Sequence, residues 1–226
     1  MKTARYGTPI CLVRDRFILA LGGQTSRFNI TKQCEAYDTQ TNHWFPIAQL
    51  PTQIINSTAV VMNQRFVYLM PGANNQSRVG NLCLINYLDT GATNLYTGDK
   101  NSRAYGNVIA TQKWEQLEVN NPDFVKSMPT AGIQLSQTEM LIFGGDKTQT
   151  FVFDTREVAA VGRTATIVTQ KPTLSCRARF GFASDYVARS FGNFMYLIDA
   201  ADQNLHVYSV KDQGWNSQKL NELAIN

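Results

Sequence analysis

The sequence predicts an all-β protein, and three observations support this prediction. Helical periodicity is nearly absent, whereas short runs rich in β-branched and aromatic residues recur along the 226-residue chain. Two such runs, Thr8–Val13 and Phe17–Leu21, flank the tight polar turn Arg14-Asp15, which is the pattern of a β-hairpin. The order of runs and turns in the first unit then repeats downstream, so the strands are expected to form several similar antiparallel sheets.

The stretch Arg16–Leu50 defines the repeating unit. An apolar run ends at a glycine pair, a polar loop leads to a run ending in Tyr-Asp, and a third run carries a tryptophan. A glycine can take positive φ and let the chain leave a sheet sharply, an aspartate can cap its own turn, and a tryptophan can seal the space between sheets. The markers of this first unit are Gly22, Gly23, Tyr37, Asp38 and Trp44.

Three further units follow the same order, although each lacks part of the pattern. The four predicted units cover approximately residues 3–50, 51–120, 128–170 and 177–221. The later units contribute the structural markers Gly72, Trp114, Gly144, Gly145 and Trp215. Unit three has a strand-like run at Thr164–Thr169, where the spacing of the tryptophans predicts one, but it carries no tryptophan.

The spacing of the strand ends gives the repeat length. The second runs close at positions 23, 72, 145 and 200, and the intervals are 72 − 23 = 49, 145 − 72 = 73 and 200 − 145 = 55. A period of about 50 residues is longer than the ~40–45 of WD repeats. The long interval contains Thr90–Asn107, which is polar and aperiodic and is therefore predicted to be a loop insertion between the third and fourth strands of unit two.

The second run of each unit is almost wholly apolar (FILAL, FVYLM, MLIF and FMYLI). Such runs are typical of strands that are buried on both faces. A β-propeller provides this burial, because each four-stranded blade packs between two neighbours. The sequence therefore predicts four four-stranded antiparallel blades.

The marker residues resemble the kelch repeat, in which a double glycine precedes a Tyr-Asp turn and a tryptophan. The resemblance covers nearly the whole chain, and Arg5 and Arg179 resemble the arginine that often opens a kelch repeat. It implies a propeller of six or seven blades that mostly serves as a protein-binding scaffold. Since the chain begins at a first strand and ends at a fourth, we expect an open arc with apolar flanks, completed by further blades or a neighbouring subunit.

Composition argues against several classes of partner. The net charge is +4 and the basic residues do not cluster, so nucleic acid is not expected as a partner. No run of about 18 apolar residues predicts a membrane span, and the N-terminal residues lack the apolar core of a secretory signal. The four cysteines form no metal-binding pair and are predicted to be free thiols in a reducing compartment, so we expect a cytoplasmic protein.

Little in the sequence indicates catalysis. His43 and His206 belong to different units, so neither a metal site nor a cofactor is expected. The alternatives are a kelch-type sugar oxidase, which would need a His/Tyr/Cys ligand set, and a sialic-acid mutarotase, which would need converging Arg, Glu and His side chains. Glu139 is the one acid near a first hairpin. A third alternative is a structural subunit of a cytoskeletal or ciliary assembly.

The loops that follow the second and fourth strands are predicted to open on one face of the molecule. They carry arginines interleaved with aromatic residues, which are the residue types that dominate interface energetics. The same composition also suits an ordinary solvated rim. With a non-catalytic protein-interaction scaffold as the expected function, the candidate residues for binding an acidic partner are Arg5, Arg27, Phe28, Arg78, Phe124, Arg177 and Arg179.

Overall fold

The computed structural model of the protein confirms the predicted all-β class. Apart from the 3-10 turn η2 (Leu220–Glu222), every element in the described part of the chain is a β-strand. The described residues are 1–64, 66–70, 72–73, 78–79, 83–87, 114–119, 129–144, 149–155, 164–165, 167–171, 186–199 and 203–222.

Sheet one has the antiparallel strand order β1-β2-β5-β6, as the repeat predicts. Its strands are β1 (Ile10–Val13), β2 (Phe17–Leu21), β5 (Cys34–Asp38) and β6 (His43–Ile47). Residues 14–16 join β1 to β2, and Arg14 and Asp15 have φ of 53° and 49°. The Arg16 N–H donates a 3.2 Å hydrogen bond to the Val13 carbonyl, so the chain turns tightly at Arg14 and Asp15, as predicted.

Sheet two has one strand more than predicted, in the order β16-β12-β11-β8-β7. Four of its strands are β7 (Ala59–Met62), β8 (Phe66–Leu69), β11 (Cys83–Tyr87) and β12 (Trp114–Val119). The fifth, β16 (Thr164–Ala165), comes from the third unit and runs parallel to β12. It occupies the outer edge of β12, whose backbone groups need a partner. The predicted insertion Thr90–Asn107 lies outside the described residues.

Sheet three consists of β13 (Pro129–Gln134), β14 (Glu139–Gly144), β15 (Gln149–Asp154) and β17 (Ile167–Lys171), in that order. The predicted single strand Thr164–Thr169 is therefore wrong, because its first residues join sheet two and the rest begin β17. Sheet four consists of β18 (Tyr186–Phe191), β19 (Phe194–Asp199), β20 (Asn204–Ser209) and β21 (Gly214–Lys219), again in chain order.

The four sheets pack face to face in the order of the chain. We call the face of a sheet that points toward the next sheet its forward face, and the opposite side its backward face. The forward face of sheet one packs on Val67 and Leu69 of sheet two, and that of sheet two packs on Met140 and Ile142 of sheet three. Phe143 of sheet three packs with Leu197 of sheet four in the same manner. The apolar contacts between sheets form the core.

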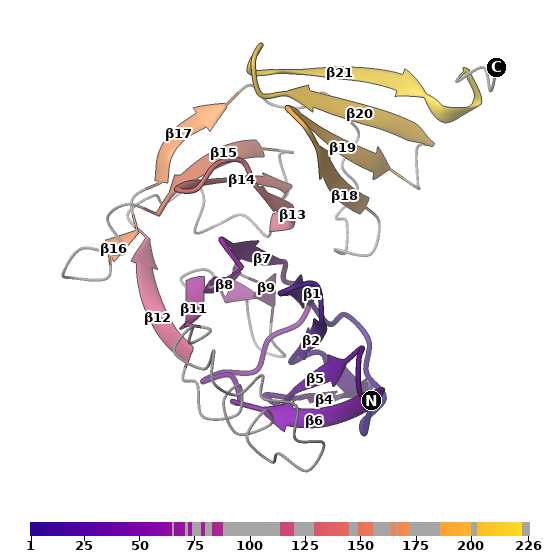
Figure 1. The fold of residues 1–226 in the computed structure, drawn as a ribbon, viewed down its shortest axis with the longest axis vertical. Coiled ribbons are helices and arrows are strands. Elements are labelled where there is room, and N and C mark those ends of the chain that lie inside the picture. Colours follow the sequence, from indigo (N-terminus) through magenta and orange to yellow (C-terminus); the bar gives the residue numbers. More distant parts are fainter. Residues whose placement is uncertain are drawn as a thin grey trace.

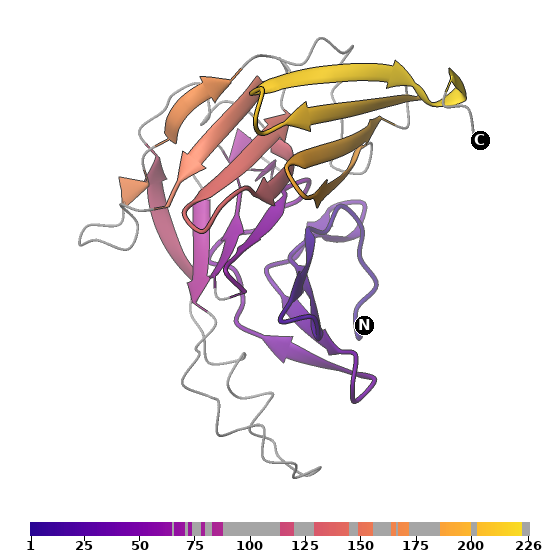
Figure 2. The same cartoon turned by 45° about the horizontal axis from the view of Figure 1, so that its top comes forward.

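The first strands of successive sheets lie together, since β1 contacts β7, β7 contacts β13 and β13 contacts β18. Figure 1 shows the four sheets following one another along an arc, with sheet one (indigo) at one end and sheet four (yellow) at the other. Figure 2 shows the same sheets in a turned view, with sheet four (orange and yellow) above sheet one (indigo). Among the described strands, β1 and β18 make no contact of the extent seen between neighbouring sheets. The arc is therefore open.

Candidate interaction surfaces

A small hairpin projects between the second and third strands of each of the first two sheets. In sheet one it is β3 (Gln24–Ser26) paired with β4 (Asn29–Ile30), and in sheet two it is β9 (Gly72–Ala73) paired with β10 (Arg78–Val79). Tyr6 extends the first hairpin through a bridge to Gln24. Because both hairpins occupy the same place in the repeat, they are equivalent features of neighbouring sheets.

Arg27 and Phe28 form the tip of the first hairpin, between Ser26 and Asn29. Phe28 is 78% exposed, and the Arg27 guanidinium lies over its ring, 5.4 Å from the centroid. Gln24 holds the tip by donating a 2.8 Å hydrogen bond from Nε2 to the Arg27 carbonyl. The tip thus presents a cation and a large apolar ring together, a combination that can bind a carboxylate and an adjoining apolar group.

For the other predicted binding residues, the structure describes either the backbone alone or nothing. Arg78 begins β10, opposite Ala73 in the equivalent hairpin, and its backbone alone is described. Phe124, Arg177 and Arg179 lie outside the described residues. The structure therefore supplies two equivalent hairpins that each carry a predicted arginine.

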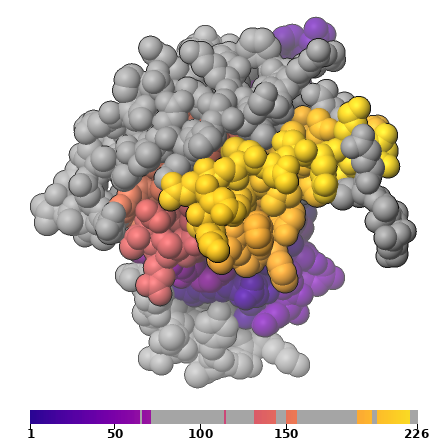
Figure 3. Space-filling model, turned by 90° about the horizontal axis from the view of Figure 1, so that it is seen from above, coloured from indigo at the N-terminus to yellow at the C-terminus, as the bar shows by residue number. Residues whose placement is uncertain are grey.

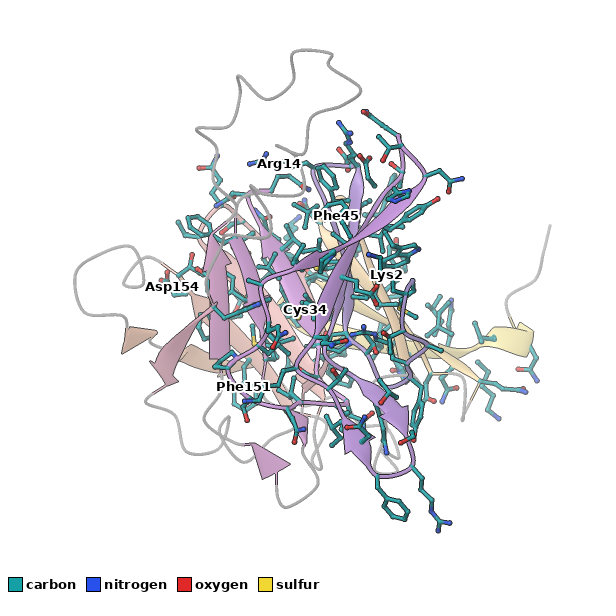
Figure 4. The ribbon with its side chains drawn as sticks, turned by 90° about the horizontal axis from the view of Figure 1, so that it is seen from below. Lys2, Arg14, Cys34, Phe45, Phe151 and Asp154 are labelled. Atoms are coloured by element: carbon teal, nitrogen blue, oxygen red, sulfur yellow. The ribbon has the colours of Figure 1, made fainter. Side chains whose placement is uncertain are left out.

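Arg5 is not available to a partner, because its side chain is 0% exposed. Its Nη1 donates to the carbonyls of Gly22 and Gln33, at 2.9 and 2.6 Å, and its Nη2 contacts Glu35 Oε2 at 2.6 Å. Lys2 adds a 2.8 Å hydrogen bond from its backbone N–H to Glu35 Oε1. Figure 4 labels Lys2 beside sheet one. Arg5 therefore fixes the N-terminal segment to sheet one and leaves the predicted binding set.

The glycine pair closes sheet one as predicted, with φ of 62° at Gly22 and 94° at Gly23. A Cβ atom on Gly23 would lie 1.9 Å from Thr8 Oγ1. The N–H of Gly22 donates to the Gln33 carbonyl and that of Gly23 to the Ile54 carbonyl, both at 3.1 Å. Gly72 lies in β9 and Gly144 ends β14, whereas Gly145 lies outside the described residues.

Asp38 caps its own turn, since its Oδ1 accepts a 3.0 Å hydrogen bond from the Gln40 backbone N–H. Its second partner, Arg16, was not predicted from the sequence. Arg16 donates from Nε and Nη2 to the two carboxylate oxygens, at 2.7 and 2.6 Å, in a buried two-point ion pair. Tyr37, the preceding marker, is half-buried and packs on Trp44 with ring centroids 5.2 Å apart. These marker residues are architectural.

The three tryptophans do not have the same environment. Trp114 of sheet two packs on the core of sheet one and donates a 3.1 Å hydrogen bond from Nε1 to the Ala48 carbonyl. Trp215 of sheet four packs on Phe143 of sheet three and donates to Thr150 Oγ1, also at 3.1 Å. Both seal a boundary with the preceding sheet, as predicted. All three rings are half-buried, but Trp44 packs on Tyr37 of its own sheet, and its neighbour Phe45 packs on the core cluster in its place.

The remaining candidate groups of the sequence lie in three different sheets. His43 is exposed in β6, while His206 is buried in β20 with Nδ1 2.7 Å from Ser217 Oγ. Glu139 begins β14 opposite Asp154. Across the described ranges, no three His, Cys, Asp or Glu residues are grouped so that they could hold a metal ion. A search of the same ranges finds no helix with the length and apolarity needed to cross a membrane.

Cys11 and Cys34 are buried free thiols in sheet one, as predicted. Burial raises the pKa of each thiol to about 12, and the nearby Cys34 adds to the rise at Cys11. Cys34 lies inside the sheet in Figure 4. A protonated, buried thiol is a poor nucleophile, so these two cysteines behave as small apolar core residues.

Comparison with known proteins gives no match, either to a family model or among curated proteins. The kelch resemblance consequently remains a prediction from the marker residues.

One exposed apolar face lies at the end of the arc, where the expected open arc has an apolar flank. The run FMYLI was expected to be buried on both faces, but in β19 only alternate residues are buried. Phe194 and Ile198 are 43% and 39% exposed on the forward face of sheet four. The apolar run itself was visible in the sequence, but its lack of a covering sheet depends on its position at the end of the arc.

Proposed function

We propose that the chain is an open segment of a kelch-type β-propeller that acts as a non-catalytic scaffold in the cytoplasm. In this proposal the hairpins β3–β4 and β9–β10 lie on one face and bind an acidic protein partner, and further blades or a neighbouring subunit complete the propeller. The proposal is supported by the four sheets of the same strand order, each packed on the next through its first strand.

The exposed pair Arg27 and Phe28 is the observation that carries the binding proposal. Burying an aromatic ring that is 78% exposed lowers the free energy of the complex, and the guanidinium beside it carries a positive charge. The intramolecular hydrogen bond that Gln24 makes to the tip holds the pair in place before binding. A preorganised tip loses less conformational entropy on association.

The free thiols of Cys11 and Cys34 support a reducing compartment, because such compartments keep cysteines unpaired. A sugar oxidase or a mutarotase would need histidine within a group of converging side chains. The two histidines, His43 and His206, lie in sheets one and four, which does not favour either alternative. A structural subunit of a larger assembly would use the same surfaces as a scaffold, and the composition of the bound proteins would identify it.

The test is a pull-down with the double variant Arg27→Glu, Arg78→Glu. Specific partners should be identified by mass spectrometry with the native chain and should be lost with the variant. The matched control is Lys211→Glu, which reverses an exposed charge in the turn between β20 and β21, at the opposite ends of the strands. Partners that are retained by the double variant at physiological salt would contradict the proposed surface.

A further inference from the structure

The forward face of sheet four closely matches a face that is buried elsewhere in the molecule. Strand β8 and the residue after it read FVYLM, and β19 contains FMYLI. In both runs the alternate residues, Phe-x-Tyr-x-Met or Ile, point to the forward side. Tyr68 and Met70 of the first run are 2% and 0% exposed, because sheet three covers them. No described sheet covers Phe194, Tyr196 and Ile198 in this way, and Figure 3 shows sheet four, in orange and yellow, at the surface.

The N-terminal segment is bonded to Glu35 on the backward face of sheet one, but no described sheet packs on this face. Ile10 and Leu12 of β1 are 64% and 48% exposed. The register places them opposite Ala20 and Ile18 of β2, as it places Ala59 and Val61 of β7 opposite Leu69 and Val67 of β8. The residues of sheet two pack on the core of sheet one. Ile10 and Leu12 occupy the equivalent positions of sheet one, and a sheet placed behind sheet one would cover them.

Trp44 lies on this same backward face. It pairs in register with Tyr37, as Trp114 pairs with Asn86 and Trp215 with Tyr208. The last two tryptophans reach the preceding sheet and donate a hydrogen bond to it. Trp44 has the same position in the repeat, and a sheet behind sheet one would bury its ring in the same manner.

We propose that the two end faces are halves of one interface, and that the forward face of sheet four binds the backward face of sheet one in a second copy of this chain. The inference rests on the open arc in the proposed function. A second copy is the occupant that the structure supports, since every copy carries both halves of a contact that the chain already makes three times between its own sheets. A head-to-tail contact of this kind closes into a ring or grows into a filament.

The chemistry of the contact follows from these residues. Phe194, Tyr196 and Ile198 would pack against Ile10, Leu12 and the ring of Trp44, all of which are apolar or aromatic. Burying such side chains removes apolar surface from water, which is the main driving force for stable subunit contacts. A charged side chain in either face would be left without a partner on association, so a single lysine should prevent it.

The experiment is sedimentation velocity over a concentration series, with two variants that each damage one half of the interface. Ile198→Lys changes sheet four and Leu12→Lys changes sheet one, both at residues that are already exposed, and Gln40→Lys adds the same charge at an exposed turn as the matched control. Far-UV circular dichroism and thermal melts check that all three variants fold. The native chain and the control should self-associate, whereas each end-face variant alone should be monomeric.

Mixing the two end-face variants gives the decisive result. The mixture retains one intact pair of faces, so it should form a one-to-one complex that grows no further. A native chain that stays monomeric at every concentration would overturn the inference. Association that persists in both variants would also overturn it, as would association that only one of the two substitutions abolishes. Both variants keep Arg27 and Phe28, so self-association and the binding of an acidic partner are tested independently. The hairpin variants alone test the binding of the acidic partner.

Discussion

Arg16 and Asp38 form a buried ion pair that joins the turn before β2 to the end of β5 in sheet one, with Nη2 and Oδ2 2.6 Å apart. Burial acts to raise the pKa of Asp38, but the hydrogen bonds from Arg16, from the Gln40 N–H and from the Thr41 side chain outweigh it and lower the pKa from 3.8 to about 2. The ionised carboxylate is thus part of the folded structure.

This pair makes sheet one sensitive to acid. A carboxyl group with a depressed pKa in the folded state contributes stability above its unfolded pKa and loses it as the pH falls through the folded value. We expect the free energy of unfolding to decrease between about pH 4 and pH 2. Asp38→Ala leaves the arginine buried without its partner and should cost about 3–5 kcal/mol at neutral pH. Urea unfolding at several pH values measures both effects, and an acid dependence that Asp38→Ala leaves unchanged would contradict this assignment.

Gly23 and Gly192 both have positive φ but differ in the space around them, which provides a matched pair of substitutions. A Cβ atom on Gly23 would meet Thr8 Oγ1 at 1.9 Å, whereas nothing lies within 4 Å of one on Gly192. Gly192→Ala should cost about 1–2 kcal/mol, the strain of a left-handed alanine. Gly23→Ala adds a steric clash to that strain and should cost more. Equal midpoints in chemical denaturation would show that the close approach at Gly23 has no effect.

Trp215→Ala should destabilise the chain by about 3–5 kcal/mol, because the ring fills the boundary between sheets three and four. Trp44→Ala should cost less in the monomer, because this ring packs on Tyr37 of its own sheet and does not bridge two sheets as Trp215 does. This ranking replaces the expectation that Trp44 fills a sealed boundary between sheets. Thermal and urea melts of the two variants at low protein concentration test this ranking. A larger loss of unfolding free energy for Trp44→Ala than for Trp215→Ala would contradict it.

Cys11 and Cys34 should resist thiol reagents in the folded protein. With the pKa raised from 9.0 to about 12, each carries roughly a thousandfold less thiolate at pH 8 than an exposed cysteine. Peptide mapping by mass spectrometry should show slow alkylation of these two residues in native buffer and rapid alkylation in denaturant. Fast native labelling at either position would show that sheet one opens readily.

The sequence predicted the strands and turns of this fold better than the long-range contacts that their side chains make. The hairpin at Arg14-Asp15 and the turn at Asp38 could be read because short-range backbone requirements select their residues. The ion pair to Arg16 and the burial of Arg5 were missed, since both depend on partners more than fifteen residues away. The division of residues 164–171 between sheets two and three was missed because an edge strand takes whichever neighbour the fold brings to it.

The exposed face of β19 was expected as a flank of the open arc, but not from the residues of the strand itself. Its run FMYLI has the composition of a strand buried on both sides, and periodicity cannot reveal whether a neighbouring sheet is present. Arg27 and Phe28 were predicted together from their residue types in a loop, and the structure places both at one hairpin tip. The burial of Arg5 shows why residue type alone could not distinguish a binding arginine from an architectural one.

The open arc holds its two end faces apart within one chain. Double electron–electron resonance between spin labels at positions 12 and 198, attached through non-natural ketone side chains, tests this most directly. When doubly labelled protein is diluted into unlabelled protein, the account predicts a long distance, because only labels within one chain are then measured. A short distance under this dilution would place sheet one against sheet four in a single chain and would contradict the open arc.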